Sequence, residues 1–295
     1  MLYYALILLS VAMFGGGFAL QDVYRKKRGS GIKISMESAF IGGISGFIVL
    51  LIINGFSFTF TAFTLIMALW SAVNGIAFTF FTFKALDHIN LSLFSLFSML
   101  GGMVLPFFQG IFFYAEEMTL AKIVCIAFIA LALGCAVEKG EKKKGLIFYI
   151  GIFILNGMSG VISKIFTASE FPKTSAAGYS IWTCCFSIAL SGITLLLLFY
   201  TDKERKGNKV LSKQVLWQSY GIGALCGVIN KVANFLLVIA LAHVDASVQY
   251  PMVTGGTMIV STLLCYFGAK KPSKKEVVSV LLAFIGMLAL FLIPV

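Results

Sequence analysis

The chain contains two copies of one short pattern, and each copy closes a long apolar stretch. The first, at 85–90, reads Ala-Leu-Asp-His-Ile-Asn, and the second, at 240–245, reads Ala-Leu-Ala-His-Val-Asp; each holds one of the two histidines. Paired glycines recur at nearly the same offset, at 101–102 and at 255–256. These echoes indicate an internal duplication, which constrains the architecture strongly because both halves must then fold alike.

The apolar stretches are long enough to cross a lipid bilayer. The chain is 59% hydrophobic and 12% charged, with a mean hydropathy of +0.98, a composition typical of membrane proteins. A helix needs about 20 predominantly apolar residues to cross the hydrocarbon layer. The sequence predicts ten such spans, at 2–20, 37–54, 62–84, 90–114, 119–136, 146–166, 177–200, 216–241, 246–269 and 276–294.

Five of these spans separate the two copies of the histidine pattern. Because five is an odd number, the two copies face opposite sides of the membrane. We therefore predict an all-α polytopic membrane protein with ten transmembrane helices in two inverted five-helix repeats, at 1–140 and 145–295. Inverted repeats that meet near the bilayer midplane are typical of transporters that work by alternating access.

Basic residues gather in alternate loops. Nineteen of the 23 lysines and arginines follow the first, third, fifth, seventh and ninth spans. The positive-inside rule predicts that these loops are cytoplasmic and that both termini are not. The net charge of +11 therefore reflects membrane topology, and we expect no nucleic-acid partner. We expect a multi-pass protein of the cell membrane, of the bacterial inner-membrane kind.

Several functional classes lack the residues that they need. An enzyme would require a nucleophile, a base or metal ligands clustered at one membrane face, and a channel would require a filter-like loop or a ring of acids. The six cysteines lie inside predicted spans without a CxxC pair and without a neighbouring histidine or carboxylate. The sequence therefore predicts no enzyme, no metal site and no cofactor.

One lysine lies deep inside a predicted span. Lys231 is roughly ten residues from either end of 216–241, about 15 Å deep, beyond the comfortable reach of a lysine stem to the interface. All twelve acidic residues lie in loops or at span edges, so none can pair with it at that depth. A substrate anion could pair with the ammonium, or the amine could be neutral. The lysine could also be a structural amine bonded to carbonyls, or it could couple transport to proton movement.

Other polar side chains recur near the middle of several spans, where together they would line a polar cavity between the halves. Each alone could instead be an interhelical hydrogen bond. With Lys231, the predicted substrate-binding residues are Ser71 and Asn74 in 62–84, Ser98 in 90–114, Asn156 in 146–166, Asn230 and Asn234 in 216–241, and Tyr250 and Thr254 in 246–269.

Three features of the sequence, taken together, resemble a known family. The ten spans in inverted halves, the histidine-containing hexads after the third and eighth spans, and Glu116-Glu117-Met118-Thr119 before the fifth are similar to the EamA-type branch of the drug/metabolite transporter superfamily. The resemblance implies a basket-like bundle whose central cavity is lined by spans 1, 3, 4, 6, 8 and 9. It also implies solutes such as amino acids, sugar nucleotides, phosphorylated metabolites or drugs.

We therefore expect a secondary transporter that moves a small anionic or zwitterionic metabolite by alternating access. Its expected partners are that small molecule and the membrane lipids; the sequence leaves open a coupling ion and the oligomeric state. One alternative is multidrug efflux, which the 29 phenylalanines and 11 methionines favour as material for an adaptable apolar pocket. A flippase for lipid-linked sugars is a second alternative.

Overall fold

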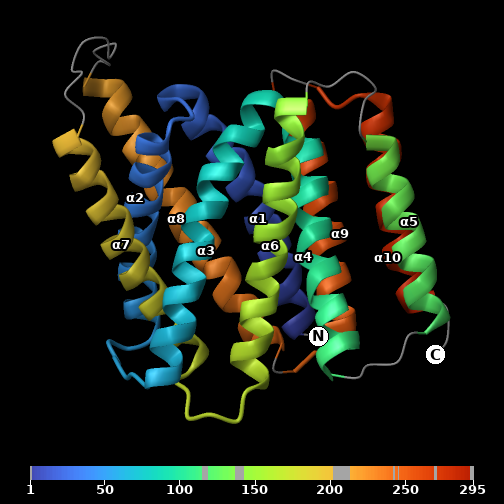
Figure 1. The fold of residues 1–295 in the computed structure, drawn as a ribbon, viewed down its shortest axis with the longest axis horizontal. Helices are drawn as coiled ribbons and strands as arrows, with labels where there is room; N and C mark the ends of the chain where they lie inside the picture. Colours follow the sequence, from blue (N-terminus) through green and yellow to red (C-terminus); the bar gives the residue numbers. More distant parts are fainter. Residues whose placement is uncertain are drawn as a thin grey trace.

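The computed structural model describes residues 2–114, 119–136, 143–201, 213–241, 243–244, 246–268 and 271–292. Within these residues the chain is all α-helical, and the ten predicted spans are confirmed as ten helices (Figure 1). The helices are α1 (Leu2–Arg28), α2 (Ile32–Ile53), α3 (Ala62–His88), α4 (Leu91–Tyr114), α5 (Leu120–Ala136), α6 (Lys143–Ala168), α7 (Ala176–Thr201), α8 (Lys213–Leu241), α9 (Ala246–Tyr266) and α10 (Lys274–Leu292).

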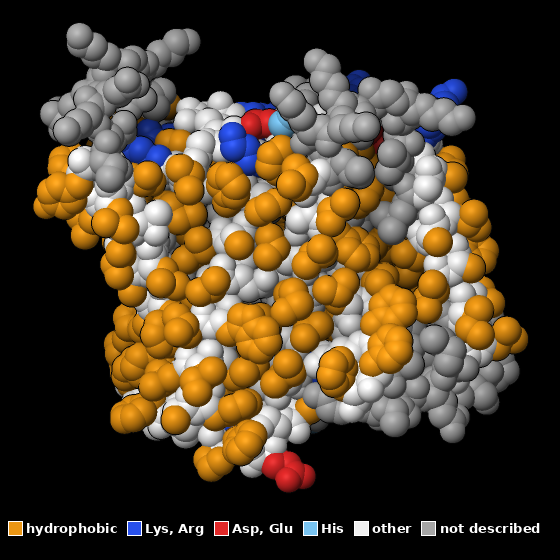
Figure 2. Space-filling view, in the orientation of Figure 1, with side chains coloured by type: hydrophobic (Ala, Val, Ile, Leu, Met, Phe, Trp, Pro, Cys, Tyr) orange, Lys and Arg blue, Asp and Glu red, His pale blue; other side chains and the backbone are white. Residues whose placement is uncertain are grey.

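The outer surface is that of a multi-pass membrane protein. Six helices, α1 to α3 and α6 to α8, are long and apolar enough to span a bilayer, and α4, α5 and α9 contain shorter apolar segments in their described parts. Hydrophobic side chains cover the middle of the face drawn in Figure 2, whereas lysines and arginines gather along its upper edge. We call this edge, where α1, α3 and α9 end and α2, α4 and α10 begin, the basic edge.

The packing of the helices follows the predicted duplication. Helix α1 packs against α8 and α9, and α6 packs against α3 and α4; α2 packs against α7, α4 against α9 and α5 against α10. When each helix is replaced by its counterpart in the other repeat (α1 by α6, α2 by α7, and so on, and the reverse), the same set of pairs results. In Figure 1, α1 begins at the lower edge while the loop that follows α6 lies at that same edge, so these two helices run in opposite directions. Opposite directions are what the predicted inversion of the two repeats requires of this pair of helices.

Two features of the sequence analysis fall on residues that are not described. The predicted boundary between the repeats, between 140 and 145, lies largely outside the described residues. So do Glu116, Glu117 and Met118 of the motif before the fifth span.

Local sequence signals set several of the helix ends. Thr61 caps α3 by accepting a hydrogen bond from the Thr64 backbone N–H at 3.2 Å, and Asn90 caps α4 by accepting one from Leu93 at 2.9 Å. Such caps satisfy backbone donors that have no partner inside the helix. Helix α1 continues past its predicted apolar span at 2–20 as far as Arg28, which carries its charged last turns to the basic edge.

Glycines allow α2 and α8 to approach closely. A Cβ atom at Gly227 would lie 2.7 Å from the Gly42 carbonyl oxygen and 2.6 Å from Ser45 Oγ, and it would also overlap Gly42 Cα. In lipid, where the hydrophobic effect does not drive helices together, such contact between small residues provides much of the packing energy. This contact brings α8, and with it Lys231, against the opposite half of the bundle.

Candidate functional site

A central cavity of about 340 Å³ lies between the two halves of the bundle. This volume is within the range of sites that bind small molecules. Eight helices line it, α1 to α4 and α6 to α9, and within the described residues no aspartate or glutamate does so. The cavity therefore combines hydroxyl and amide groups with a single basic side chain, that of Lys231.

Lys231 enters the cavity from α8 and rests on small neighbours. A Cβ atom at Gly46 would lie 2.6 Å from Lys231 Cγ and 3.5 Å from Cys184 Sγ, so the lysine stem passes between α2 and α7. The residue is partly buried. Across the part of the chain that the structure describes, its ammonium has no ion pair and no hydrogen-bond partner. An ammonium inside a membrane bundle is stable only if it faces water, a partner or a ligand.

Two asparagines of the cavity join neighbouring helices. Asn74 of α3 donates through Nδ2 to the Leu155 carbonyl of α6 at 2.9 Å, and Asn156 of α6 donates through Nδ2 to the Ser98 carbonyl of α4 at 2.6 Å. These bonds hold α3, α6 and α4 in a fixed relation around the cavity wall. The two side chains thus have a structural task in addition to any contact with a ligand.

The asparagines of α8 are oriented within their own helix. Asn234 donates to the Asn230 carbonyl at 2.9 Å, and the Asn230 amide contacts Cys226 Sγ at 3.3 Å. A Cβ atom at Gly17 would lie 2.5 Å from Asn230 Oδ1, so the side chain of Asn230 packs directly on α1. Asn234 and Lys231, three residues apart, share one face of α8 and both line the cavity.

Eight of the nine predicted site residues line this cavity, so the structure brings together side chains that the sequence could only propose one by one. They are Ser71, Asn74, Asn156, Asn230, Lys231, Asn234, Tyr250 and Thr254. Ser98, the ninth, is not among the lining residues. Its side chain is fully buried away from the cavity, and the residue contributes its backbone carbonyl to Asn156 instead.

The implied set of lining helices was incomplete. Helices α2 and α7 also line the cavity, the latter with Tyr179, Ser180, Thr183 and Ser187. Tyr179, Thr183 and Ser187 are spaced by four residues, which places their hydroxyl-bearing side chains on one face of α7. That spacing was present in the sequence, but serine and threonine also bond within their own helix, so it did not by itself identify α7 as a wall of the site.

A hydroxyl cluster lies at the α3–α6–α7 side of the cavity. The Tyr179 hydroxyl lies beside the side chains of Ser71, Ser163 and Thr183, and all four residues line the cavity. Only 7% of Tyr179 is exposed, and its hydroxyl is a buried group without a hydrogen bond of regular geometry within the described residues. Its ring stacks on Phe166 of α6, with 4.3 Å between ring centroids.

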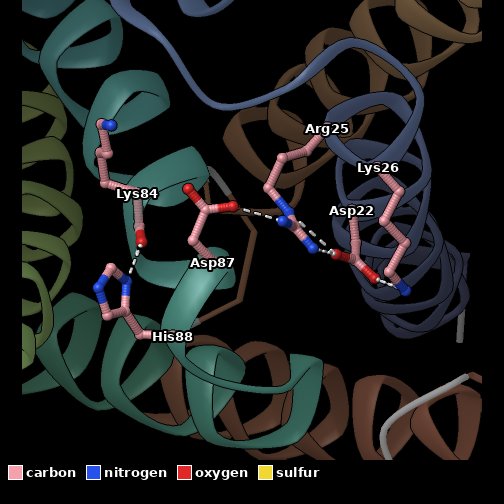
Figure 3. A network of polar contacts seen from close by, with 6 residues as sticks. All are labelled: Asp22, Arg25, Lys26, Lys84, Asp87 and His88. Carbon is pink, nitrogen blue, oxygen red and sulfur yellow. Dashed lines mark hydrogen bonds and ion pairs between the residues drawn. The ribbon is translucent and has the colours of Figure 1, made fainter.

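Ion pairs join the helices at the basic edge (Figure 3). Arg25 of α1 bonds to Asp22 at 2.8 Å and reaches across to Asp87 of α3 at 2.5 Å. One turn further along α1, Arg28 pairs with Glu37 of α2. Just beneath these pairs, the fully buried rings of Tyr24 and Phe83 lie 5.9 Å apart. All four ion pairs within the described residues lie at this edge.

Comparison with known proteins establishes the fold alone. No family model and no curated protein matches the sequence. Among solved structures, one described as "Crystal structure of protein" is similar to this chain, with a TM-score of 0.62 and 16% identity. The alignment covers 97% of this chain and 99% of the other, so the likeness extends over the whole helical bundle.

Proposed function

We propose that this protein is a secondary transporter that moves a small anionic or zwitterionic metabolite across the membrane by alternating access. The observation that carries the proposal is the unpaired Lys231 in a cavity without an acidic residue among its described lining. An ammonium in that position lacks the partner that would compensate its removal from water. An anionic group of the solute would supply that partner.

The architecture supports a transport cycle. Inverted repeats provide two related arrangements of the same helices, which open the central site to one side or the other. In the arrangement described here, ion pairs of Arg25 and Arg28 and the buried Tyr24–Phe83 pair lie between the cavity and the basic edge. We infer that these contacts separate on passage to the alternate arrangement, and that the solute binds to both.

The composition of the cavity favours a polar metabolite over a hydrophobic drug. Its described lining includes three phenylalanines, Phe14, Phe18 and Phe78, although the chain contains 29. Hydroxyl and amide side chains from α3, α6, α7, α8 and α9 line the wall beside apolar groups, which contribute the larger share of its surface. Membership of the EamA-type branch of the drug/metabolite transporters is part of this proposal, as is a cytoplasmic location for the basic edge.

Replacing Lys231 by methionine tests the proposal. Methionine keeps the unbranched stem that packs against Gly46 and removes only the charge. We expect uptake of anionic or zwitterionic solutes into proteoliposomes to fall at least about 30-fold, because removing one partner of a buried charge pair costs about 2–5 kcal/mol. Lys231→Arg should retain part of the activity.

A second lysine provides the matched control. Lys84 also lies within a helix and is partly buried, but it is outside the lining of the cavity. Lys84→Met removes the same charge and should leave uptake nearly unchanged. Full uptake by Lys231→Met at normal protein levels would refute the assignment, and equal losses in the two variants would trace the effect to net charge.

A further inference from the structure

The Tyr179 hydroxyl is one of three buried polar groups of the described cavity lining that have no hydrogen bond of regular geometry, with the Oε1 atoms of Gln21 and Gln249. A buried hydroxyl normally has a hydrogen-bond partner, and one without it lowers the stability of the fold. The Tyr179 hydroxyl has none of regular geometry in the described residues, although three other hydroxyl side chains lie beside it. Its ring is held by stacking on Phe166, so the bundle would pack equally well around a phenylalanine.

The hydroxyl cluster is offset along the axis of α7 from the level of the Lys231 stem. Lys231 is level with Cys184 of α7, because the lysine stem and the Cys184 sulfur flank the same glycine, Gly46. Tyr179 precedes Cys184 by five residues, which corresponds to about 7.5 Å along the helix axis. A single small molecule can therefore contact the ammonium with one end and the hydroxyl cluster with the other.

The two ends of the cavity call for different chemistry. The ammonium is a compact single charge and suits a carboxylate, whereas a phosphate monoester carries about 1.5 to 2 negative charges at neutral pH. The cluster of Ser71, Ser163, Tyr179 and Thr183 offers groups that both donate and accept hydrogen bonds. A carbon chain bearing hydroxyl groups matches such a wall, since each of its hydroxyls also donates and accepts.

We propose that Tyr179, with Ser71, Ser163 and Thr183, forms a hydroxyl-binding subsite, and that the solute is a hydroxylated carboxylate, with its acid at Lys231 and its hydroxylated tail at Tyr179. This inference rests on the proposed transport function and narrows its substrate class. Tyr179 acts as a specificity-determining residue, because it distinguishes a hydroxylated chain from a plain hydrocarbon chain of equal length.

The test compares D-gluconate with hexanoate, which has the same carbon chain without hydroxyls. Binding to the purified full chain is measured by calorimetry and by the rise in apparent melting temperature. The wild type should prefer gluconate. Tyr179→Phe should weaken gluconate binding between about threefold and tenfold, the value of one neutral hydrogen bond, and leave hexanoate binding unchanged. Lys231→Met should weaken the binding of both.

Stability without ligand provides a separate measurement. Because the hydroxyl has no hydrogen bond of regular geometry within the described residues, Tyr179→Phe should melt at the same temperature as the wild type or higher. Tyr200→Phe is the matched control, since Tyr200 is exposed on the same helix and outside the cavity lining. It should change neither binding nor stability.

The outcomes of these measurements separate the two proposals. If Tyr179→Phe binds gluconate as well as the wild type does, or melts several degrees lower with its preference intact, the hydroxyl is structural and the subsite is refuted. Lys231-dependent binding of hexanoate and gluconate with equal affinity, or of zwitterions such as serine alone, would overturn the subsite and leave the transport proposal standing. If no carboxylate or zwitterion binds in a Lys231-dependent manner, both proposals fail.

Discussion

The ion pair between Arg25 and Asp87 allows a quantitative test of how the basic edge closes. Arg25 is 12% exposed at its side chain and contacts both Asp22 and Asp87, whereas Asp87 is 31% exposed. In Figure 3 the guanidinium lies between the two carboxylates, one from α1 and one from α3. In the proposed cycle, this bond across the helices must break before the cavity opens to the basic edge.

The two partners should contribute about equally, because a single bond between them crosses the helices. Asp87→Asn removes one charge-assisted bond at a partly exposed carboxylate and leaves Arg25 paired with Asp22, so we expect it to favour opening by about 1 kcal/mol. Arg25→Gln removes the same bond, and its pairing with Asp22 lies within α1 and is present in both arrangements, so we again expect about 1 kcal/mol. This value corresponds to about a fivefold increase in the population open to the basic edge.

A natural cysteine can report that population. Cys226 lines the cavity on α8, is 5% exposed, and lies 3.5 Å from the Gly17 carbonyl oxygen of α1. With the other five cysteines replaced, a membrane-impermeant maleimide is applied to vesicles whose basic edge faces outward. The labelling rate of Cys226 should rise about fivefold in Asp87→Asn and by a similar factor in Arg25→Gln.

Two results would refute this reasoning. Labelling rates equal to that of the parent would mean that the ion pair does not hold the edge closed. A similar rise in Glu170→Gln, which removes an exposed acid between α6 and α7, outside the described ion pairs, would mean that net charge governs the equilibrium. In a double-mutant cycle, the double variant Arg25→Gln/Asp87→Asn should change the free energy of opening by less than the sum of the changes in the two single variants.

Two further substitutions test the packing around the cavity by denaturant titration of the purified protein. Gly227→Ala should destabilise the protein by about 1–3 kcal/mol, because the new methyl group meets the Gly42 backbone. Gly221→Ala on the same helix is the control, since its methyl group meets nothing within 4 Å and should leave the stability unchanged. Equal effects of the two substitutions would refute the close contact between α2 and α8. Asn74→Leu should cost about 0.6–1.7 kcal/mol by removing its bond to Leu155, and an unchanged stability would show that this bond contributes nothing.

The architecture was predictable because its signals are long and repeated. Each span needs about 20 apolar residues, so small errors at its ends leave the number of crossings unchanged. The hexads at 85–90 and 240–245 then give the inversion by counting alone. The extension of α1 to Arg28 was less evident, because its last turns are charged and no longer contribute to an apolar span.

The residues of the candidate site were predictable only where a polar side chain interrupts an apolar span. Lys231 and the mid-span asparagines are conspicuous because polar groups in lipid require partners. Hydroxyl residues are not conspicuous, since serine and threonine also bond within their own helix, as Thr183 does with the Tyr179 carbonyl at 2.9 Å. Ser98 and Thr183 therefore look alike in sequence, and only the helix packing places one in the core and the other at the cavity.

The histidine hexads also show where the two repeats differ in charge. Asp87 occupies a position where the second copy has Ala242, so the acid that receives Arg25 has no counterpart in the other half. At the edge opposite the basic edge, aromatic contacts join the helices instead, including Trp182 with Phe58 at 4.6 Å. In the proposed cycle, two identical repeats would make the two arrangements of an inverted bundle equal in energy. The Arg25–Asp87 contact, which among the described residues belongs to the first repeat alone, would remove that equality and favour the arrangement in which the basic edge is closed.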